Sequence, residues 1–353
     1  MSKPLHDPER TLATVSHRFG LTSICAGRVA FVSSATGRHL TRQAYAQTAE
    51  VMDQLPVRLY ASFAARQGGG NVAGVVYDDQ GLDPTRMQFL AADLNAPTTG
   101  FVRRLDDAVF GVRFFSPTME MDMCGHVTIG VFSALYDDGR LLGSGPGQPI
   151  TAVQRTAAGD LIIAVEPDGA GKPLVTMRQN APIYDDAHVS LEEISELLGV
   201  KRGLVLQPMG IVSTALRHLF VQLPHVVDLD SIKPDDAGLT ALSHRLGVDT
   251  IGVWALHGEE ERATVRVRDL CHGVGNTEEA ASGTTNGALA CWLTKRALLP
   301  DHAGSTVNVV AEQGFEMGRP SIVRTRLTCD DGSVRAVDVG GAATRLLEGV
   351  VYA

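Results

Sequence analysis

Two stretches of the chain, one around Cys124 and one around Ser282, follow the same plan, and this internal repeat constrains the fold most. Each begins with an apolar run typical of a buried strand, at Val112–Phe115 and at Thr264–Arg268. Each then passes through a turn into a run with the apolar spacing of a helix. Cys124 and Ser282 are the central residues of the two stretches. A Glu lies four residues before each of them, and a Gly directly follows each. The repeat predicts two related halves that face each other across a cleft.

Cys124 lies, in this plan, in a turn that opens a helix over Val127 to Tyr136. Backbone N–H groups are free at a helix start, and the partial positive charge there favours an anion. Such a position lowers the pKa of a thiol and can hold a substrate carboxylate. We therefore expect Cys124 to ionise more easily than the other four cysteines. The alternative is that Cys124 is a small buried residue, since free Cys is among the most buried residue types.

Composition and charge exclude several classes of function. The chain has 353 residues, of which 44% are hydrophobic and 20% charged, and this favours two domains that each bury a core. A net charge of -9 without a run of Lys or Arg argues against a nucleic-acid partner. The five cysteines form no CxxC pair, and His225, His244 and His257 do not lie at metal-ligand spacing from a carboxylate. Since a dinucleotide fingerprint and a phosphate-binding loop are also missing from the sequence, we expect neither a metal nor an organic cofactor.

The chain shows no targeting or membrane signal. Its first residues include no apolar signal region, and no run of about 18 uncharged apolar residues follows. We therefore expect no membrane association and a cytoplasmic location.

The pattern contains more strands than helices, which favours an α+β fold with a curved mixed sheet around one helix in each half. Residues 1–56 are expected to form an N-terminal extension, with a helix over Thr41–Gln54 that Pro56 ends. Asp168–Pro173 is the expected domain boundary, and Gly340–Gly341 the expected final turn. Other expected elements are strands at Leu216–Leu223 and Thr250–Leu256 and helices at Asp83–Leu94, Leu191–Gly199 and Asp236–Gly247.

The glycines Gly68 to Gly70 precede Asn71, whose amide is a candidate for substrate binding. Three glycines allow a backbone to approach a ligand closely. They also suit a hairpin turn, and both readings stay open here.

Several of these segments together resemble the phenazine-biosynthesis (PhzF-like) isomerase family, within the diaminopimelate epimerase and proline racemase superfamily. The matching segments run from about Val57 to the C-terminus; they are Gly70–Val76, Met87–Gln88, Asn95, Phe101–Val102, Val112–Thr118, Cys124–Thr128, Glu278–Leu289 and Glu312–Ser321. The resemblance implies two pseudo-symmetric domains, over 57–168 and 169–337, with the final segment 338–353 returning to the first. It also implies a homodimer and proton transfer next to a substrate carboxylate, without a metal or cofactor.

The sequence departs from the family pattern at two places. Phenazine enzymes carry a catalytic Glu where this chain has Thr98, which cannot act as a carboxylate base. Epimerases and racemases of the superfamily use one Cys in each half. Cys124 matches the first, and Ser282 stands in place of the second.

These observations lead to a set of candidate site residues. Cys124 is the expected base, His126 orients or shuttles a proton, and Ser282 lies on the opposite face. Candidate catalytic residues are Cys124, Ser282, His126 and Glu279, and candidate substrate-binding residues are Asn71, Thr98, Gly125, Glu278, Gly283 and Thr284. Backbone N–H groups near Gly125 and Gly283 would hold the substrate carboxylate, and Glu278 or Glu279 a substrate amino group.

Three functions are compatible with this site. The first is an isomerase or epimerase of a small amino or cyclic imino acid. The second is a dehydratase of the hydroxyproline type with Cys124 as its sole base. The third is a non-catalytic protein that binds a small carboxylate.

Overall fold

The computed structural model of the chain describes residues 54–143, 148–168, 171–259, 262–299, 306–331 and 333–352. The predicted N-terminal extension and its helix lie outside these residues as far as residue 53. The strands are β1 (Gln54–Ser62), β2 (Asn71–Tyr77), β3 (Thr98–Asp106), β4 (Val109–Phe115), β5 (Glu120–Met121), β6 (Ile150–Thr156), β7 (Gly159–Pro167), β8 (Pro173–Gln179), β9 (Ile183–Asp186), β10 (Leu206–Ser213), β11 (Arg217–Gln222), β12 (Thr250–Leu256), β13 (Val265–Leu270), β14 (Thr306–Gln313), β15 (Ser321–Asp330) and β16 (Ser333–Tyr352). The helices are α1 (Pro84–Leu94), α2 (Gly125–Asp137), α3 (Leu191–Leu197), α4 (Val226–Leu229), α5 (Asp236–Leu246) and α6 (Gly283–Lys295), with a 3₁₀ turn at His272–Val274.

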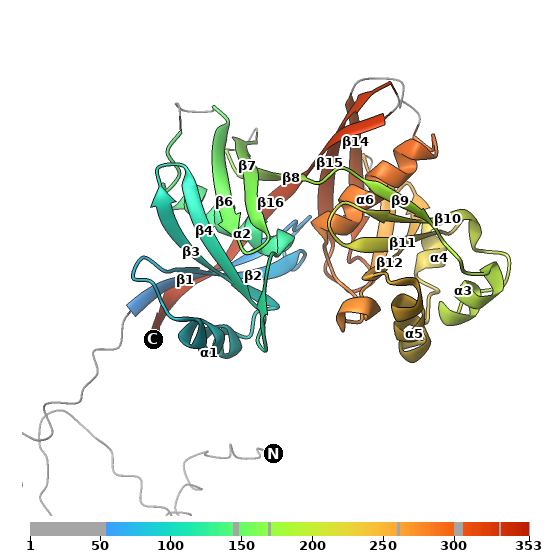
Figure 1. Cartoon of the computed structure of the whole chain (residues 1–353), viewed down its shortest axis with the longest axis horizontal. Coiled ribbons are helices and arrows are strands. Elements are labelled where there is room, and N and C mark those ends of the chain that lie inside the picture. The colour runs from blue at the N-terminus through green and yellow to red at the C-terminus, as the bar shows by residue number, and fades with distance from the viewer. Residues whose placement is uncertain are drawn as a thin grey trace, which may run out of the picture. The chain divides into compact units, whose positions relative to one another are not determined.

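The strands join into one mixed sheet, in the order β1-β2-β3-β4-β6-β7-β8-β16-β15-β14-β13-β12-β11-β10-β9. From β1 to β8 the pairs are antiparallel, parallel, antiparallel, parallel, antiparallel and antiparallel. From β10 to β16 the same succession of pairings occurs. The mixed α+β class expected from the sequence is therefore confirmed, and the pairing pattern occurs twice along the chain (Figure 1).

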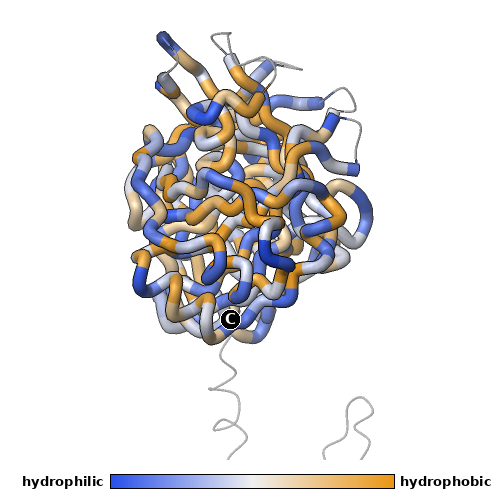
Figure 2. Tube along the Cα trace, turned by 90° about the vertical axis from the view of Figure 1, so that its right-hand side faces the viewer, coloured by the Kyte–Doolittle hydropathy of each residue, from blue (hydrophilic) through white to orange (hydrophobic). Residues whose placement is uncertain are grey.

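Helices α2 and α6 each lie against strands of one half. Helix α2 packs against β1, β2, β3, β7, β8 and β16, and helix α6 against β10, β11, β12, β14, β15 and β16. Both are buried on nearly every side, which explains why their apolar residues are not confined to one stripe. Figure 2 shows hydrophilic residues at many outer turns and hydrophobic residues along the segments inside. Among the described residues no helix is both long and apolar enough to span a bilayer.

Helix α1 begins where the sequence predicts. Asp83 caps α1 by accepting hydrogen bonds from the N–H groups of Thr85 and Arg86, and Pro84 occupies the first turn. Strand β12 covers Thr250–Leu256, as predicted. Strand β1 begins at Gln54, so the predicted extension ends before residue 56: Gln54 to Pro56 pair with the end of β16 and do not form the end of a helix.

The turn predicted at Gly340–Gly341 is wrong. Strand β16 runs without interruption through both glycines, pairing with β15 and β8 first and with β1 later. A Cβ atom at Gly340 would overlap the carbonyl oxygen of Val175 on β8 and lie 2.7 Å from Thr176 Oγ1. The glycine is needed for close approach of two strands and not for a turn.

Replacing Gly340 by Ala should therefore destabilise the protein by about 1–3 kcal/mol, as expected for an overpacked position. Gly349 lies in the same strand and offers a matched control, because a Cβ there would meet only ordinary contacts at 3.8 and 3.9 Å. Gly349→Ala should change stability by less than about 0.5 kcal/mol. Urea unfolding of both variants provides the measurement. Equal stability of the two would show that β8 and β16 do not approach each other this closely.

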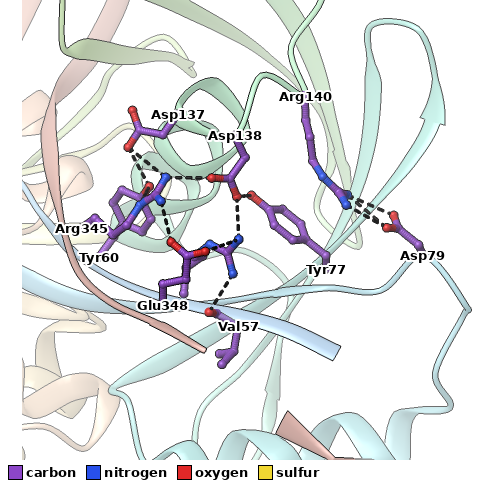
Figure 3. Close-up of polar contacts among 10 residues, drawn as sticks. Val57, Tyr60, Tyr77, Asp79, Asp137, Asp138, Arg140, Arg345 and Glu348 are labelled. Atoms are coloured by element: carbon purple, nitrogen blue, oxygen red, sulfur yellow. Dashed lines mark hydrogen bonds and ion pairs between the residues drawn. The ribbon is translucent and has the colours of Figure 1, made fainter. Parts of the chain in front are cut away.

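A polar cluster attaches the end of β16 to the first half (Figure 3). Arg345 on β16 donates to Tyr60 Oη at 2.9 Å and pairs with Asp138 Oδ1 at 2.8 Å. Tyr60 donates to Asp137 and Tyr77 to Asp138, both at 2.7 Å. Two carboxylates at the C-terminal end of α2 oppose the helix dipole, so the guanidinium of Arg345 offsets an otherwise unfavourable charge. The described residues from 54 onward form a single compact unit.

Candidate active site

The starts of α2 and α6 lie close together. Cys124 is the N-cap of α2 and Ser282 the N-cap of α6, both in extended backbone conformation. A Cβ atom on Gly125 or on Gly283 would lie 3.0 Å from the same atom, Cε of Met177. The predicted position of Cys124 at a helix start is therefore confirmed, and the two repeats bring their central residues to one place.

Asn71 connects the two helix starts. Its Nδ2 lies 3.3 Å from Nδ1 of His126, in the second position of α2. The same Nδ2 donates to the carbonyl oxygen of Ala281, immediately before Ser282, also at 3.3 Å. The Sγ atom of Cys124 lies 3.3 Å from Nδ1 of His126. Residues of both repeats thus contact each other through one buried amide.

The expected low pKa of Cys124 is wrong. Burial, with only 8% of the residue exposed, raises its pKa to about 12, and the nearby charge of Glu279 raises it further. The N–H groups of Val127 and His126 and the hydroxyl of Thr98 act in the opposite direction, but burial outweighs them. The thiol is therefore protonated at neutral pH. Burial also raises the pKa of Cys271, Cys291 and Cys329, so ionisation does not set Cys124 apart.

His126 is neutral for the same reason. Burial lowers its pKa to about 4, although a hydrogen bond with the backbone of Val72 favours the charged form. A neutral imidazole has one donor and one acceptor nitrogen. Its Nδ1 can then accept a hydrogen bond from the thiol of Cys124 or from the amide of Asn71.

Glu279 is the candidate whose proton affinity suits neutral pH. Its side chain is partly exposed and surrounded by protein, and burial raises its pKa to about 7, with a smaller contribution from the charge of Asp269. Its charge in turn raises the pKa of Cys124, so it acts on the α2 side of the site. A carboxyl group with a pKa near the working pH both accepts and releases a proton readily.

Glu278, the neighbouring candidate, faces another group. Its two carboxylate oxygens accept hydrogen bonds from Nε and Nη2 of Arg268 at 3.0 and 2.7 Å. The corresponding residue of the first repeat, Glu120, forms the same bidentate pair with Arg113 at 2.7 and 2.8 Å. Both glutamates that precede the central residues are thus engaged with an arginine of the preceding strand.

Ser282 is held firmly at the start of α6. Its Oγ accepts from the N–H of Thr285 at 3.3 Å and lies 3.1 Å from Oγ1 of Thr284. Gln313 on β14 accepts from the N–H of Ser282 at 3.2 Å and donates to the carbonyl of Glu279 at 2.7 Å. The fully buried amide of Gln313 therefore fixes the whole turn before α6.

The glycine loop before Asn71 contacts protein and not an open site. Arg319 donates to the carbonyl oxygens of Gly70 and Gly69 at 2.8 and 3.3 Å. A Cβ atom on Gly69 would overlap the carbonyl oxygen of Pro320. These glycines allow two loops to pack closely, which is the structural reading of the motif.

Sequence reasoning missed three buried polar residues of this region: Asp269, Thr285 and Gln313. Asp269 ends a strand of alternating Arg and Val, where a charged residue gives no sign of burial. Thr285 lies within the motif that was identified, one residue beyond the candidates.

Among the described residues no group of three His, Cys, Asp or Glu side chains is arranged to hold a metal ion. Two cavities lie away from the helix starts. One is lined by the end of β12 and the residue after it, His257, by the segments before β13 and after α6, and by β14, including Asn308. The other is lined by residues of β7, β8, β14, β15 and β16, including Glu166 and Arg324. Neither contains a candidate residue.

Comparison with known protein families gives one match. The family model described as phenazine biosynthesis-like protein (PhzC-PhzF) matches residues 60–349. A protein of Deinococcus radiodurans named an uncharacterized isomerase is 34% identical over 296 residues, which cover 82% of this chain and 92% of that protein. The trans-2,3-dihydro-3-hydroxyanthranilate isomerase of Pseudomonas aeruginosa is 28% identical over 296 residues, 82% of this chain and 97% of the enzyme.

Solved structures share the fold. A PhzF-family phenazine biosynthesis protein of Bacillus anthracis is 25% identical and superposes with a TM-score of 0.76 over 86% of this chain and 100% of that one. A hydroxyproline epimerase of Agrobacterium vitis is 13% identical, with a TM-score of 0.56 over 84% of this chain and 91% of the epimerase. The second likeness concerns the fold alone.

Proposed function

The chain belongs to the phenazine biosynthesis-like (PhzF) family of isomerases, and we propose that it moves a proton at a carbon next to the carboxylate of a small amino or cyclic imino acid. The observation that carries this proposal is Glu279. Its carboxyl group is poised near neutrality beside two helix starts that favour an anion. The family resemblance inferred from the motifs is confirmed by the match over residues 60–349.

In the proposed reaction, Glu279 is the base. Its ionised carboxylate takes the proton from the substrate carbon, and the electron pair left behind spreads into the substrate carboxylate. That carboxylate would lie at the N–H groups that open α2 and α6, near Gly125 and Gly283. Donors fixed at a helix start stabilise the developing charge without reorganising.

Cys124, the base expected from the sequence, receives a different role in this proposal. Its raised pKa keeps the thiol neutral, so it donates a hydrogen bond to the anion that forms rather than removing the proton. Nδ1 of His126 lies 3.3 Å from the thiol and is itself contacted by Nδ2 of Asn71. The hydroxyl of Thr98 favours the ionised form of the thiol, but burial outweighs it.

The substrate of the Pseudomonas enzyme is not carried over to this chain. We propose that Thr98 replaces the catalytic Glu of the phenazine enzymes, and its hydroxyl donates to the carbonyl oxygen of Pro97 at 2.8 Å. A threonine cannot serve as a carboxylate base at neutral pH. The reaction therefore depends on Glu279 as the base, and on a substrate whose reacting carbon can reach Glu279.

We also propose that the two halves are pseudo-symmetric, with the predicted boundaries at 57–168 and 169–337. Two observations support this proposal. The order of strand pairings is repeated, and in each half the fourth residue of the central helix forms a hydrogen bond with a side chain on a strand. Gln154 on β6 donates to Thr128 of α2 at 3.0 Å, and Asn286 of α6 donates to Gln313 on β14 at 2.6 Å. The homodimer, the cytoplasmic location and the independence from metal and cofactor stay predictions, testable by sedimentation, fractionation and dialysis against a chelator.

The proposed function is tested by incubating the purified protein in deuterated water with a panel of small amino and cyclic imino acids. We expect deuterium at the carbon next to the carboxylate, together with inversion or a double-bond shift. Loss of water from a hydroxylated compound would instead identify a dehydratase. If no compound exchanges, the protein is a binding homologue and the proposal is wrong.

A further inference from the structure

A chain of three oxygen atoms leads from the start of α6 into the protein interior. The Oγ atom of Ser282 lies 2.9 Å from Oγ1 of Thr285, and this Oγ1 lies 2.6 Å from Oδ2 of Asp269. Thr285 is fully buried, and Asp269, near the end of β13, is 1% exposed. Ser282 itself is partly exposed. One end of the chain can therefore meet a substrate, while the other end is a buried carboxyl group.

Asp269 is an unusual buried carboxyl group. Its Oδ1 is buried without a hydrogen-bond partner, and among the described residues no Lys or Arg forms an ion pair with it. Nearby, Nε2 of the fully buried His218 also lacks a partner, and its Nδ1 lies 2.8 Å from the hydroxyl of Thr250. Burying a carboxylate without a cation favours the form that holds a proton.

The hydrogen bonds of Thr285 can run in either direction. Its hydroxyl has one proton and donates to only one partner at a time. Asp269 and Ser282 are the nearer side-chain partners, at 2.6 and 2.9 Å, and Nδ1 of His218 lies farther away, at 3.4 Å. With Asp269 ionised, Thr285 donates to Asp269 and accepts from Ser282. With Asp269 protonated, Asp269 donates to Thr285, which donates to Ser282. The two patterns differ by the transfer of one proton along the chain.

We propose that Asp269, acting through Thr285 and Ser282, is the proton reservoir of the α6 side of the site; this proposal rests on the proposed function. Ser282 gives its hydroxyl proton to the substrate carbanion, and a C–H bond forms. At the same time Ser282 takes the proton of Thr285, and Thr285 takes that of Asp269, whose O–H bond breaks. The carbanion is neutralised and the negative charge ends on Asp269, so that no other reactant is needed.

Glu279, the proposed base, lies next to this relay. The N–H of Glu279 donates to the carbonyl of Asp269 at 3.1 Å, so the two residues lie side by side. Burial raises the pKa of Asp269 to about 6, and its charge contributes to the raised pKa of Glu279. Two neighbouring buried carboxyl groups do not ionise easily together. When Glu279 takes a proton from the substrate, Asp269 can therefore release its own more easily.

The α2 side has no equivalent relay. Thr285 is the third residue of α6, and the third residue of α2 is Val127, which has no hydroxyl. A serine hydroxyl is a much weaker acid than a thiol. Ser282 therefore needs the carboxyl group of Asp269 as its proton source, whereas a thiol at the same position would not.

The test compares Thr285→Val, which keeps the shape of the side chain, with Thr285→Ser, which keeps the hydroxyl. We expect Thr285→Val to lower the deuterium exchange rate at least about tenfold, mainly in kcat, and Thr285→Ser to retain most of the rate. Asp269→Asn should lower the rate as much, and the double variant no further, because both act in one chain. If Val preserves the rate and Ser does not, Thr285 fills space and the relay is wrong.

A second readout is independent of the substrate. Above the pKa of Asp269, about 6, its ionised carboxylate can accept a proton. There a sulfonyl fluoride such as phenylmethanesulfonyl fluoride should label Ser282: an O–S bond forms, fluoride leaves, and the hydroxyl proton passes through Thr285 to Asp269. Labelling should disappear in Ser282→Ala and fall at least about tenfold in Thr285→Val and Asp269→Asn. If the wild type exchanges with no compound but shows this pattern, only the proposed function fails. If labelling of Ser282 is absent, or equal in all variants except Ser282→Ala, the relay is overturned.

Discussion

Replacing Glu279 by Gln should lower the rate of deuterium exchange by about 10²–10⁴-fold, the contribution typical of a general base. The substitution removes a partly exposed carboxyl group whose pKa burial raises to about 7. Gln has nearly the same shape and cannot accept the proton. The secondary structure and the unfolding midpoint should stay close to those of the wild type.

The pH dependence of the exchange rate provides a second test of Glu279 as the base. A base works in its ionised form, so the rate of the wild type should rise with pH as Glu279, with its pKa of about 7, loses its proton. Because the relay needs Asp269 in its protonated form, with a pKa of about 6, the rate should pass through a maximum between these two values and fall at higher pH. This rise should be absent from the residual rate of the variant. Cys124→Ser is the informative comparison, because a neutral thiol that only donates a hydrogen bond should cost less than the base. If Cys124→Ser abolishes exchange and Glu279→Gln preserves it, the base is Cys124, as the sequence suggested.

Replacing Arg268 by Met should destabilise the protein by about 3–5 kcal/mol, the usual cost of removing one partner of a buried ion pair. The side chains of Arg268 and Glu278 are only 10% and 13% exposed, and Arg268 also donates to the carbonyl of Leu229 at 3.0 Å. Without the guanidinium, the carboxylate of Glu278 stays in a poorly solvated place beside the site. The turn before α6 should loosen as a result.

The first repeat offers the control for this prediction. Arg113 and Glu120 form the same bidentate pair, but their side chains are 40% and 41% exposed. Arg113→Met should therefore cost no more than about 1 kcal/mol. Urea unfolding of both variants provides the comparison. If the two variants lose similar free energies of unfolding, the Arg268–Glu278 pair is not more buried than the Arg113–Glu120 pair. The buried position assigned to Glu278 would then be wrong.

The sequence predicts the fold well where local pattern decides it. The helix starts at Cys124 and Ser282 and the strand at Thr250–Leu256 follow from apolar spacing and turn residues, and all three are confirmed. The turn at Gly340–Gly341 failed because a glycine pair signals either a turn or a close approach of strands. Only the position of Val175, far away in the chain, decides between them.

Contacts among some of the candidate site residues could be predicted from the sequence, but their electrostatics could not. Asn71, Cys124 and His126 come together as the motifs suggested. The pKa of Cys124 was predicted in the wrong direction, because the helix start is a local feature and burial is a tertiary one. Asp269 and Thr285 were missed for the same reason, since their importance comes from contacts between separate elements.

The most direct measurement is a crystal structure with a planar carboxylate analogue of a compound that exchanges deuterium. We predict that the carboxylate of the analogue lies at the starts of α2 and α6. Its reacting carbon should lie about 3–3.5 Å from an oxygen of Glu279. An analogue bound instead in the cavity lined by Glu166 and Arg324, or with Glu279 turned away from its reacting carbon, would contradict the proposed function.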